Sequence, residues 1–367
     1  LAMGLRGMIA EIRARLEEED DAGAREFLEA ALIALQGAQG FIRRHAELLN
    51  DMAGKEADAA GREELAALAE ICGHIAEGAP RDFHEALQLC WFVYFLVSIE
   101  SGHMIHDSGP GTLDRWLNDF YREETGAGNL APARALELLQ CFFVEMNASI
   151  SRGGILPVTI GGVDESGAGG ENELTWLMMK AVRDLKVLHP SLALRYHAGT
   201  PRDLLRAAVE MIGEGSTYPA LFNDAVCVKS LVRSGVAEKD AVDWVHSICT
   251  ELTAVGCTNG WIAAPYFNMA KALELTLNHG RCLLTGKELG EDVGGIEEYK
   301  NFEELYAAYQ REIGAIMKTG VEAAAYNERQ ARERSPYPLL SCFTEECVRR
   351  GLDFTAGGAR YNPDYIH

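Results

Sequence analysis

The chain has 367 residues, of which 48% are hydrophobic, a composition that excludes a disordered or fibrous protein and is sufficient for a sizeable core. Its formal net charge of −21 at pH 7 opposes binding to nucleic acid and to anionic membranes. The longest apolar run, residues 89–99, is too short to span a membrane, and the first residues do not have the pattern of a signal peptide.

The nine cysteines are scattered along the chain and form no Cys-x-x-Cys pair. An odd number of cysteines in a chain of this length argues against a disulfide framework and against a zinc ribbon. Most of them have apolar neighbours, and a buried free cysteine behaves as a small hydrophobic residue. We therefore expect a cytoplasmic protein, because thiols stay reduced in that compartment.

The first part of the chain is predicted to be helical, because strong helix formers and apolar residues recur there at spacings of three and four. Pro80 and Asp82 provide a start signal for the most apolar of these helices. The predicted helices cover residues 5–19, 24–50, 61–76, 80–100 and 132–147.

The pattern then changes to short apolar segments bounded by glycine or proline, which is typical of buried strands. The predicted strands are 155–163 and 191–197, and 219–224 is a short strand or turn. Further helices are predicted over 202–215, 238–248, 264–279 and 302–326. Helices around short buried strands indicate an α/β fold, and without repeats or a linker residues 1–367 are expected to form a single domain.

Two polar segments were considered as binding sites. His103, His106 and Asp107 in "GHMIHD" could ligate a metal, but they lack the helical spacing and the glutamate of a zinc protease, so we expect a polar loop and no metal. The glycine-rich segment 159–170 lacks the register of a phosphate-binding loop, so we expect a surface turn there.

The segment "HSICTELTAVGCTNGW", residues 246–261, places Cys249 two residues before Glu251. Spacing alone favours a core cysteine beside a solvated glutamate. A nucleophilic cysteine activated by His246 is a second reading, although no orienting residue or oxyanion hole accompanies it. A third reading is a thiyl radical on Cys249, which needs no base, with Glu251 transferring the proton.

Motifs along essentially the whole chain resemble those of the glycyl radical enzymes, the superfamily of pyruvate formate-lyase and its dehydratase and decarboxylase relatives. The matching stretches occur in the family's order: "GLRGMIAEIRARL", "PRDFHEALQLCWFVYFLVSIESGH", "LDRWLNDFY", "PSLALRYHAGTP", "PALFND", "ICTE", "GW", "YFNMAKALELTLNHG" and "GGARYN".

The resemblance implies part of a ten-stranded α/β barrel, built from two antiparallel five-stranded half-barrels and surrounded by helices. It also implies that Cys249, at the tip of a central loop, is the thiyl residue and that Glu251 is the acid/base of a Cys-x-Glu site. A glycyl radical on a C-terminal glycine, installed by an activating enzyme that uses S-adenosylmethionine and a 4Fe-4S cluster, would oxidise the cysteine. This chain has no segment that matches the glycyl loop, so we expect that loop and an N-terminal part to lie outside it.

Several positions depart from the family pattern. Ile248 stands where pyruvate formate-lyase has a second cysteine, which argues against formate-lyase activity. Ala263 replaces the aspartate that contacts substrate hydroxyls in the diol dehydratases. His103 matches a pocket histidine, Met104 replaces a pocket serine, and Tyr266 matches a position that can face the pocket. These changes favour a less polar substrate with an aryl or alkyl group. The segment around Gly154 is shorter than in the family.

The resemblance therefore predicts a glycyl radical lyase that abstracts hydrogen from a small organic substrate, followed by dehydration, C–S cleavage or arylacetate decarboxylation. The alternatives are a pyruvate formate-lyase-like acyltransferase, a non-radical cysteine hydrolase that uses Cys249 and His246, and a non-catalytic half-barrel that binds partners. The expected partners are the activating enzyme and a second copy of the chain, since the family is commonly dimeric.

Overall fold

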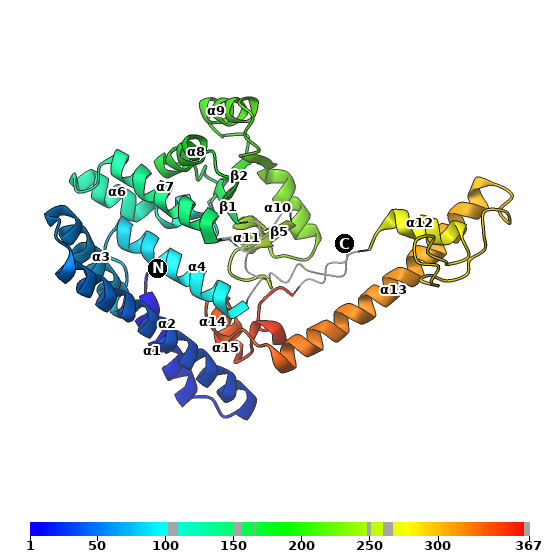
Figure 1. Ribbon diagram of the computed structural model, residues 1–367, viewed down its shortest axis with the longest axis horizontal. Helices are drawn as coiled ribbons and strands as arrows, with labels where there is room; N and C mark the ends of the chain where they lie inside the picture. The colour runs from blue at the N-terminus through cyan, green and yellow to red at the C-terminus, as the bar shows by residue number, and fades with distance from the viewer. Residues whose placement is uncertain (102–108, 150–155, 165, 248–250, 260–266, 363–367) are drawn as a thin grey trace. The chain divides into compact units, whose positions relative to one another are not determined.

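The computed structural model describes residues 1–101, 109–149, 156–164, 166–247, 251–259 and 267–362 (Figure 1). The chain divides into two compact units. Unit 1 comprises Leu1–Gly260 and Tyr337–Tyr361, and unit 2 comprises Trp261–Pro336 and Asn362–His367. Each unit is described separately below.

Unit 1 contains most of the helices. They are α1 (Gly4–Glu17), α2 (Ala22–Lys55), α3 (Ala59–Glu77), α4 (Phe83–Ser101), α5 (Leu113–Trp116), α6 (Asn118–Ala127), α7 (Pro132–Ser149), α8 (Glu173–Leu185), α9 (Arg202–Gly213), α10 (Asp224–Arg233), α11 (Glu238–Ala241), α14 (Pro338–Cys342) and α15 (Cys347–Arg350), with a short 3₁₀ helix at Phe354–Ala356. The long helices predicted from the sequence are confirmed in α1 to α4, α7 and α9. No helix in the described ranges is long and apolar enough to cross a membrane.

The main core of unit 1 follows from the apolar spacing of these helices. Leu28, Leu35 and Ile42 recur every seven residues along α2 and are fully buried. Each such side chain contributes about 1.5–3 kcal/mol through burial of apolar surface. Helices α1 and α3 pack against α2, and α4 packs against α3, α6 and α7. The capping aspartate of α2, Asp21, accepts a hydrogen bond from the Ala24 amide at 2.9 Å, which fixes the start of the helix.

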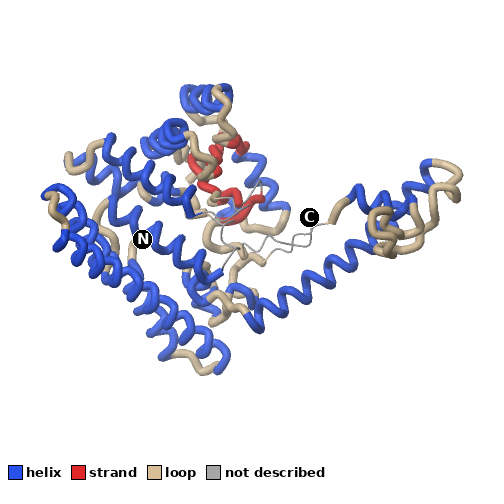
Figure 2. The backbone as a smooth tube through the Cα atoms, in the orientation of Figure 1, coloured by secondary structure: helices blue, strands red, loops and turns tan. Residues whose placement is uncertain are grey.

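A three-stranded parallel sheet with strand order β1-β2-β3 lies in unit 1. Figure 2 draws the strands in red. The strands are β1 (Pro157–Gly161), β2 (Ser191–Tyr196) and β3 (Ala220–Asn223). Nearly every residue of β1 and β2 is buried, as expected for parallel strands that are covered on both faces. The two predicted strands are therefore confirmed, the segment 219–224 contains a strand, and the chain has the predicted α/β architecture.

The predicted helix 238–248 is wrong beyond its first turn. Helix α11 ends at Ala241, and the chain continues into an antiparallel hairpin of β4 (Trp244–Ser247) and β5 (Glu251–Ala254). The reason is tertiary: the backbone carbonyls of Val242 and Trp244 accept hydrogen bonds from the buried Arg195 side chain instead of from amides one helical turn later. Strand β4 also lies beside β1 of the parallel sheet.

Unit 2 contains α12 (Met269–Leu277), α13 (Phe302–Arg334) and the long connection between them. Asn268 and Asn301 cap the two helices, and the Tyr309 hydroxyl on α13 donates a hydrogen bond to the Met269 carbonyl at 3.2 Å. Both helices were predicted from the sequence. Helix α13 extends past the predicted end at residue 326.

Candidate functional site

Glu251 is the one residue of the predicted site that the structure describes. The other predicted residues lie outside the described ranges: Cys249, His103, Met104, Ala263 and Tyr266. The geometry of the site is therefore built from Glu251 and the hairpin that carries it.

Glu251 is the first residue of β5 and is paired with Ser247, the last residue of β4. Three residues connect them, and Cys249 is the middle one. Consecutive Cα atoms are about 3.8 Å apart, so the Cα atoms of Cys249 and Glu251 are separated by at most about 7.6 Å for any conformation of the connection. This bound follows from their separation of two residues in the sequence, and the pairing of β4 with β5 puts Glu251 at the end of the described ladder.

The two faces of the hairpin have different surroundings. Trp244 and Leu252 lie on one face, where they pack in a small apolar cluster with residues of α10. Residues directly opposite in an antiparallel pair share a face, so Ser247 and Glu251 belong to the other face, together with Val245 and Thr253. Glu251 therefore belongs to the face opposite the Trp244 cluster.

A cavity of about 630 Å³ adjoins the hairpin. It is lined by residues of both strands, and apolar residues of α1 and α4 line much of the remainder. The lining residues of the hairpin are Val245, His246, Ser247, Thr253 and Ala254. No aspartate, glutamate, lysine or arginine is among its described lining residues. Its size and mostly apolar wall are typical of a pocket for a small organic molecule.

The base of the hairpin is held by Arg195, the next-to-last residue of β2, which is the central strand of the sheet. Its side chain is 0% exposed. Its Nη1 donates to the Trp244 carbonyl at 3.0 Å, and its Nη2 donates to the Val242 carbonyl at 2.7 Å. The guanidinium also lies over the Trp244 ring, 4.8 Å from the ring centre. One side chain thus binds the backbone immediately before and at the start of β4.

Asp224, which is 1% exposed, neutralises this buried cation. Its Oδ1 accepts from Arg195 Nε at 2.9 Å and from the Trp244 indole at 2.6 Å, while its Oδ2 accepts from the Val163 amide at 2.9 Å. Burial lowers the pKa of Arg195, and the charge of Asp224 opposes that shift. Gly162 makes room for the pair: its φ is +82°, and a Cβ there would lie 2.4 Å from Arg195 Nε. We call Arg195, Asp224 and Trp244 the hairpin cluster.

His246 fixes β4 to β1 two residues further along the hairpin. Its Nδ1 lies 2.8 Å from the Thr159 hydroxyl, and its backbone amide donates to the same oxygen at 3.2 Å. Burial lowers the pKa of His246 to about 4, although the nearby Ser191 carbonyl and the charge of Glu251 act in the opposite direction. The contact of Nδ1 with Thr159 gives this imidazole a structural role between β4 and β1.

The exit of the hairpin is held by the "GGARYN" segment. Tyr361 accepts from the Asn259 amide at 2.7 Å and donates its own amide to the Cys257 carbonyl at 2.9 Å. Its hydroxyl donates to Asp240 at 2.6 Å, and Arg360 binds the same carboxylate at 2.8 Å. This motif of the sequence therefore has a structural role beside the site.

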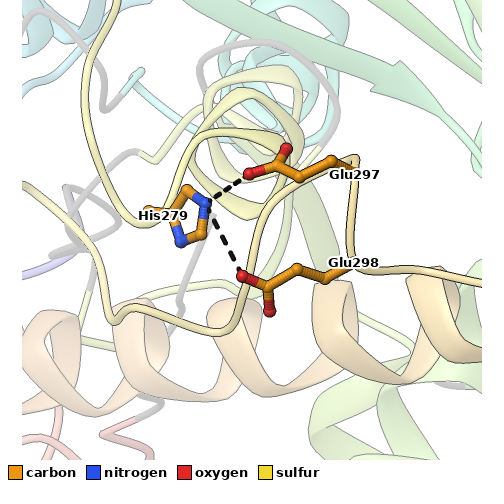
Figure 3. Close-up of side chains that lie close together, drawn as sticks. All are labelled: His279, Glu297 and Glu298. Atoms are coloured by element: carbon orange, nitrogen blue, oxygen red, sulfur yellow. Dashed lines mark hydrogen bonds and ion pairs between the residues drawn. The ribbon is translucent and has the colours of Figure 1, made fainter.

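A second polar cluster lies in unit 2, in the connection between α12 and α13 (Figure 3). His279 contacts Asp292 through Nδ1 at 2.9 Å and Glu297 through Nε2 at 2.9 Å, and Glu298 lies 3.9 Å from Nε2. Hydrogen bonds to the two nearer carboxylates raise the pKa of His279. His279, Glu297 and Glu298 could offer ligands to a cation, but the two carboxylates are more than half exposed and already lie against the imidazole. We call His279, Asp292, Glu297 and Glu298 the loop cluster.

Sequence reasoning missed the hairpin cluster. The signal was available in "SLALRYH", where an arginine interrupts a buried apolar strand, and in "PALFND", where an aspartate follows the neighbouring strand. A charge that is buried in a strand requires a partner at the same level of the sheet. The pairing of β2 with β3 supplies that partner, because Arg195 is opposite Phe222, two residues before Asp224.

The family model described as "Pyruvate formate lyase-like" matches residues 1–367. The chain is 34% identical over 381 residues to a (2S)-3-sulfopropanediol dehydratase of Klebsiella oxytoca, covering 99% of this chain and 46% of that protein. It is 32% identical to an isethionate sulfite-lyase of Nitratidesulfovibrio vulgaris, covering 91% of this chain and 42% of that protein.

Among solved structures, a glycyl radical enzyme from Archaeoglobus fulgidus superposes with a TM-score of 0.89 at 30% sequence identity. That superposition covers 98% of this chain and 48% of the solved chain. The chain thus spans about half the length of the curated relatives that it matches.

Proposed function

The chain belongs to the pyruvate formate lyase-like family, and from this premise we propose that it forms the central part of a glycyl radical lyase with a Cys-x-Glu site. Cys249 is the thiyl residue and Glu251 the proton-transfer residue. One observation supports the proposal: the hairpin pairs Ser247 with Glu251, and Cys249 is the middle one of the three residues between them in the sequence.

In the complete enzyme, the sheet and hairpin of unit 1 belong to a ten-stranded α/β barrel of two five-stranded half-barrels. The glycine that carries the stored radical lies on a segment outside this chain. A separate activating enzyme that uses S-adenosylmethionine and a 4Fe-4S cluster generates that radical.

The chemistry assigns a distinct task to each residue. The Cys249 sulfur radical takes a hydrogen atom from a substrate carbon, so a C–H bond breaks, an S–H bond forms and the unpaired electron moves to that carbon. The bond to a leaving group on the neighbouring carbon then breaks. Glu251 transfers the proton that accompanies this departure, a contribution of about 10²–10⁴ in rate for a positioned acid or base. The hydrogen returns from sulfur to the product radical and restores the thiyl.

The substrate class follows from the leaving group and the cavity. The relatives are named for the dehydration of a sulfonated diol and for the release of sulfite from isethionate. In this chain Ala263 and Met104 replace polar positions of the family's pocket, and the cavity beside the hairpin has a mostly apolar wall. These features favour a small substrate with an alkyl or aryl group, cleaved by dehydration, C–S elimination or arylacetate decarboxylation.

The proposed partners are the activating enzyme and a second copy of the protein in a homodimer. The eight described cysteines are free thiols, which is consistent with a reducing cytoplasm, where radical chemistry would run without oxygen.

The test uses the complete polypeptide of the same gene, prepared without oxygen and activated with its partner enzyme and S-adenosylmethionine. The panel is (2S)-3-sulfopropanediol, isethionate, propane-1,2-diol and an arylacetate, with products identified by mass spectrometry. We expect one compound to be converted, no turnover by Cys249→Ser, and a loss of about 10²–10⁴ in kcat for Glu251→Gln.

Cys257→Ser is the matched control, because Cys257 is a buried cysteine close to the same hairpin. This variant should retain activity. Full activity of Cys249→Ser, or equal losses in both serine variants, would contradict the assignment of Cys249.

A further inference from the structure

We propose that Arg195 is a positioning residue for catalysis: with Asp224 it holds the base of the β4–β5 hairpin and thereby the placement of Glu251. This inference rests on the proposed function of the hairpin. Arg195 touches neither substrate nor the reacting atoms in this account, and it acts through the backbone that it binds.

Arg195 binds the backbone at the origin of β4. Its donors reach the carbonyls of Val242 and Trp244, which flank the point where the chain leaves α11 and enters β4. These two contacts set the position and direction of the strand at its origin. From Trp244 the ladder runs without interruption to the pair of Ser247 and Glu251 at the other end of the hairpin.

The cluster is itself anchored to the sheet. Arg195 belongs to β2, and Asp224, directly after β3, accepts from Arg195, from the Trp244 indole and from the Val163 amide that follows β1. The hairpin is thus tied to three parallel strands through one ion pair. A rigid sheet is a more precise support for a reactive group than a surface loop.

The buried ion pair of Arg195 and Asp224 needs an explanation beyond stability. Removing two charges from water is costly, and apolar residues of similar volume often provide equal or greater stability at such a site. Stability alone therefore does not explain the pair. A guanidinium offers several donors in a fixed plane, so it can bind two carbonyls and a carboxylate at once, whereas lysine offers a single charged point. The guanidinium therefore fixes the orientation of the backbone carbonyls that it binds, which apolar packing does not do.

Neighbouring residues are adapted to the cluster. Gly162 has a positive φ and leaves the space that Arg195 Nε occupies. His246 then binds Thr159 of β1, so β4 is fixed at two points, Trp244 and His246, on the same strand. Correct placement of reacting groups is worth a large share of the rate, and a displacement of about 1 Å can lower it about 10²-fold.

The experiment compares a double variant, Arg195→Met with Asp224→Leu, with Arg81→Met in the complete activated enzyme. The double variant removes both charges, so no unpaired ion remains and the fold should survive. Arg81 pairs with the buried Glu85 at the start of α4, so Arg81→Met breaks an ion pair that does not contact the hairpin. Electron paramagnetic resonance measures the radical, and kcat and KM are measured with the panel compound that the wild type converts.

For the double variant we expect an unchanged glycyl signal, KM within about threefold of wild type, and kcat lowered by about 10²-fold. Arg195→Lys should give an intermediate kcat, because it restores the charge without the planar donors. Arg81→Met should lower the denaturation midpoint and leave kcat unchanged. Wild-type kcat in the double variant, or an equal kcat loss in Arg81→Met, would overturn the inference.

A second readout separates this inference from the proposed function. If the wild type forms no radical and converts nothing, the proposed function fails. The inference is then judged by hydrogen–deuterium exchange, in which amides of β4 and β5 should exchange about 10²-fold faster in the double variant than in wild type while those of α2 are unchanged. Unchanged exchange in the hairpin would show that Arg195 does not hold it.

Discussion

The hairpin cluster of unit 1 and the loop cluster of unit 2 each combine a basic side chain with carboxylates, but they differ in burial. Arg195 and Asp224 are at most 1% exposed, and their contacts reach the backbone of neighbouring strands. In the loop cluster the His279 side chain is 37% exposed and Asp292 is 68% exposed, and the contacts of His279 are with its neighbours in one connection.

The difference teaches that surroundings, more than the number of charges, decide what a polar cluster does. Water and salt screen the carboxylates around His279, so that ion pair contributes little to stability and fixes little geometry. Inside unit 1 the same type of interaction is unscreened, and each lost partner leaves a buried group unpaired. A buried cluster such as that of Arg195 and Asp224 can therefore hold the β4–β5 hairpin in place.

The histidines of the two regions sharpen this contrast. Burial lowers the pKa of His246 to about 4, so this side chain is neutral near pH 7. Hydrogen bonds to Glu297 and Asp292 raise the pKa of His279, so this side chain keeps its charge to higher pH. The pKa values of these two histidines are thus shifted in opposite directions by their surroundings.

The largest effect is expected from removing one partner of the buried pair. Asp224→Leu leaves the Arg195 cation without a counterion and should destabilise unit 1 by about 3–5 kcal/mol. The double variant with Arg195→Met should recover most of this loss, because it buries no unpaired charge. Urea denaturation of the two variants measures the difference, and equal destabilisation by both would contradict the assignment of an uncompensated buried charge.

The pH dependence of His246 is the next largest effect. The folded state holds His246 with a pKa of about 4, whereas a free histidine has a pKa of about 6.5, so the folded state binds fewer protons between these values. Its contribution is complete above pH 6.5 and is lost as the pH falls towards 4, by up to about 3 kcal/mol. Denaturation midpoints from pH 7 to pH 4 test this.

His246→Asn is the comparison for that prediction, since asparagine can still bind Thr159 but does not titrate. The variant should lose stability less steeply between pH 6.5 and pH 4 than the wild type. Identical pH profiles would show that His246 is not the group responsible.

The space beside Arg195 gives a third test. Gly162→Ala requires an alanine at φ +82° and places its Cβ against the guanidinium, so it should cost about 1–3 kcal/mol. Gly167→Ala is the matched control, because Gly167 has a similar φ of +80° and nothing lies within 4 Å of a Cβ there. The excess cost of Gly162→Ala over Gly167→Ala in urea denaturation measures the steric part, and equal costs would contradict it.

The smallest effect is expected in the loop cluster. Nuclear magnetic resonance titration should give His279 a pKa above 6.5 at low salt and a value closer to 6.5 in 1 M salt. The reason is that the screening length for exposed charges falls to about 3 Å in 1 M salt. His279→Gln should leave the denaturation midpoint unchanged. A salt-independent pKa would contradict the screening that separates the two clusters.

Much of this arrangement could be predicted from the sequence, and the exceptions have physical causes. The long amphipathic helices and the buried strands follow from local periodicity, which is a property of neighbouring residues. The helix prediction for 244–247 is wrong because the carbonyls of Val242 and Trp244 accept hydrogen bonds from Arg195. Arg195 lies some fifty positions away in the chain, so local periodicity does not reveal this contact. The prediction of Cys249 and Glu251 as site residues comes from the family motifs, whereas Arg195 and Asp224 become visible only when β2 and β3 are paired.

The measurement that tests the central claim most directly is the electron paramagnetic resonance spectrum of the complete activated enzyme, recorded without oxygen for wild type and Cys249→Ser. The account predicts a glycyl doublet in both proteins, because the radical is stored on glycine, with substrate turnover only in the wild type. Absence of a doublet under conditions that activate a known relative, or turnover by Cys249→Ser, would contradict it.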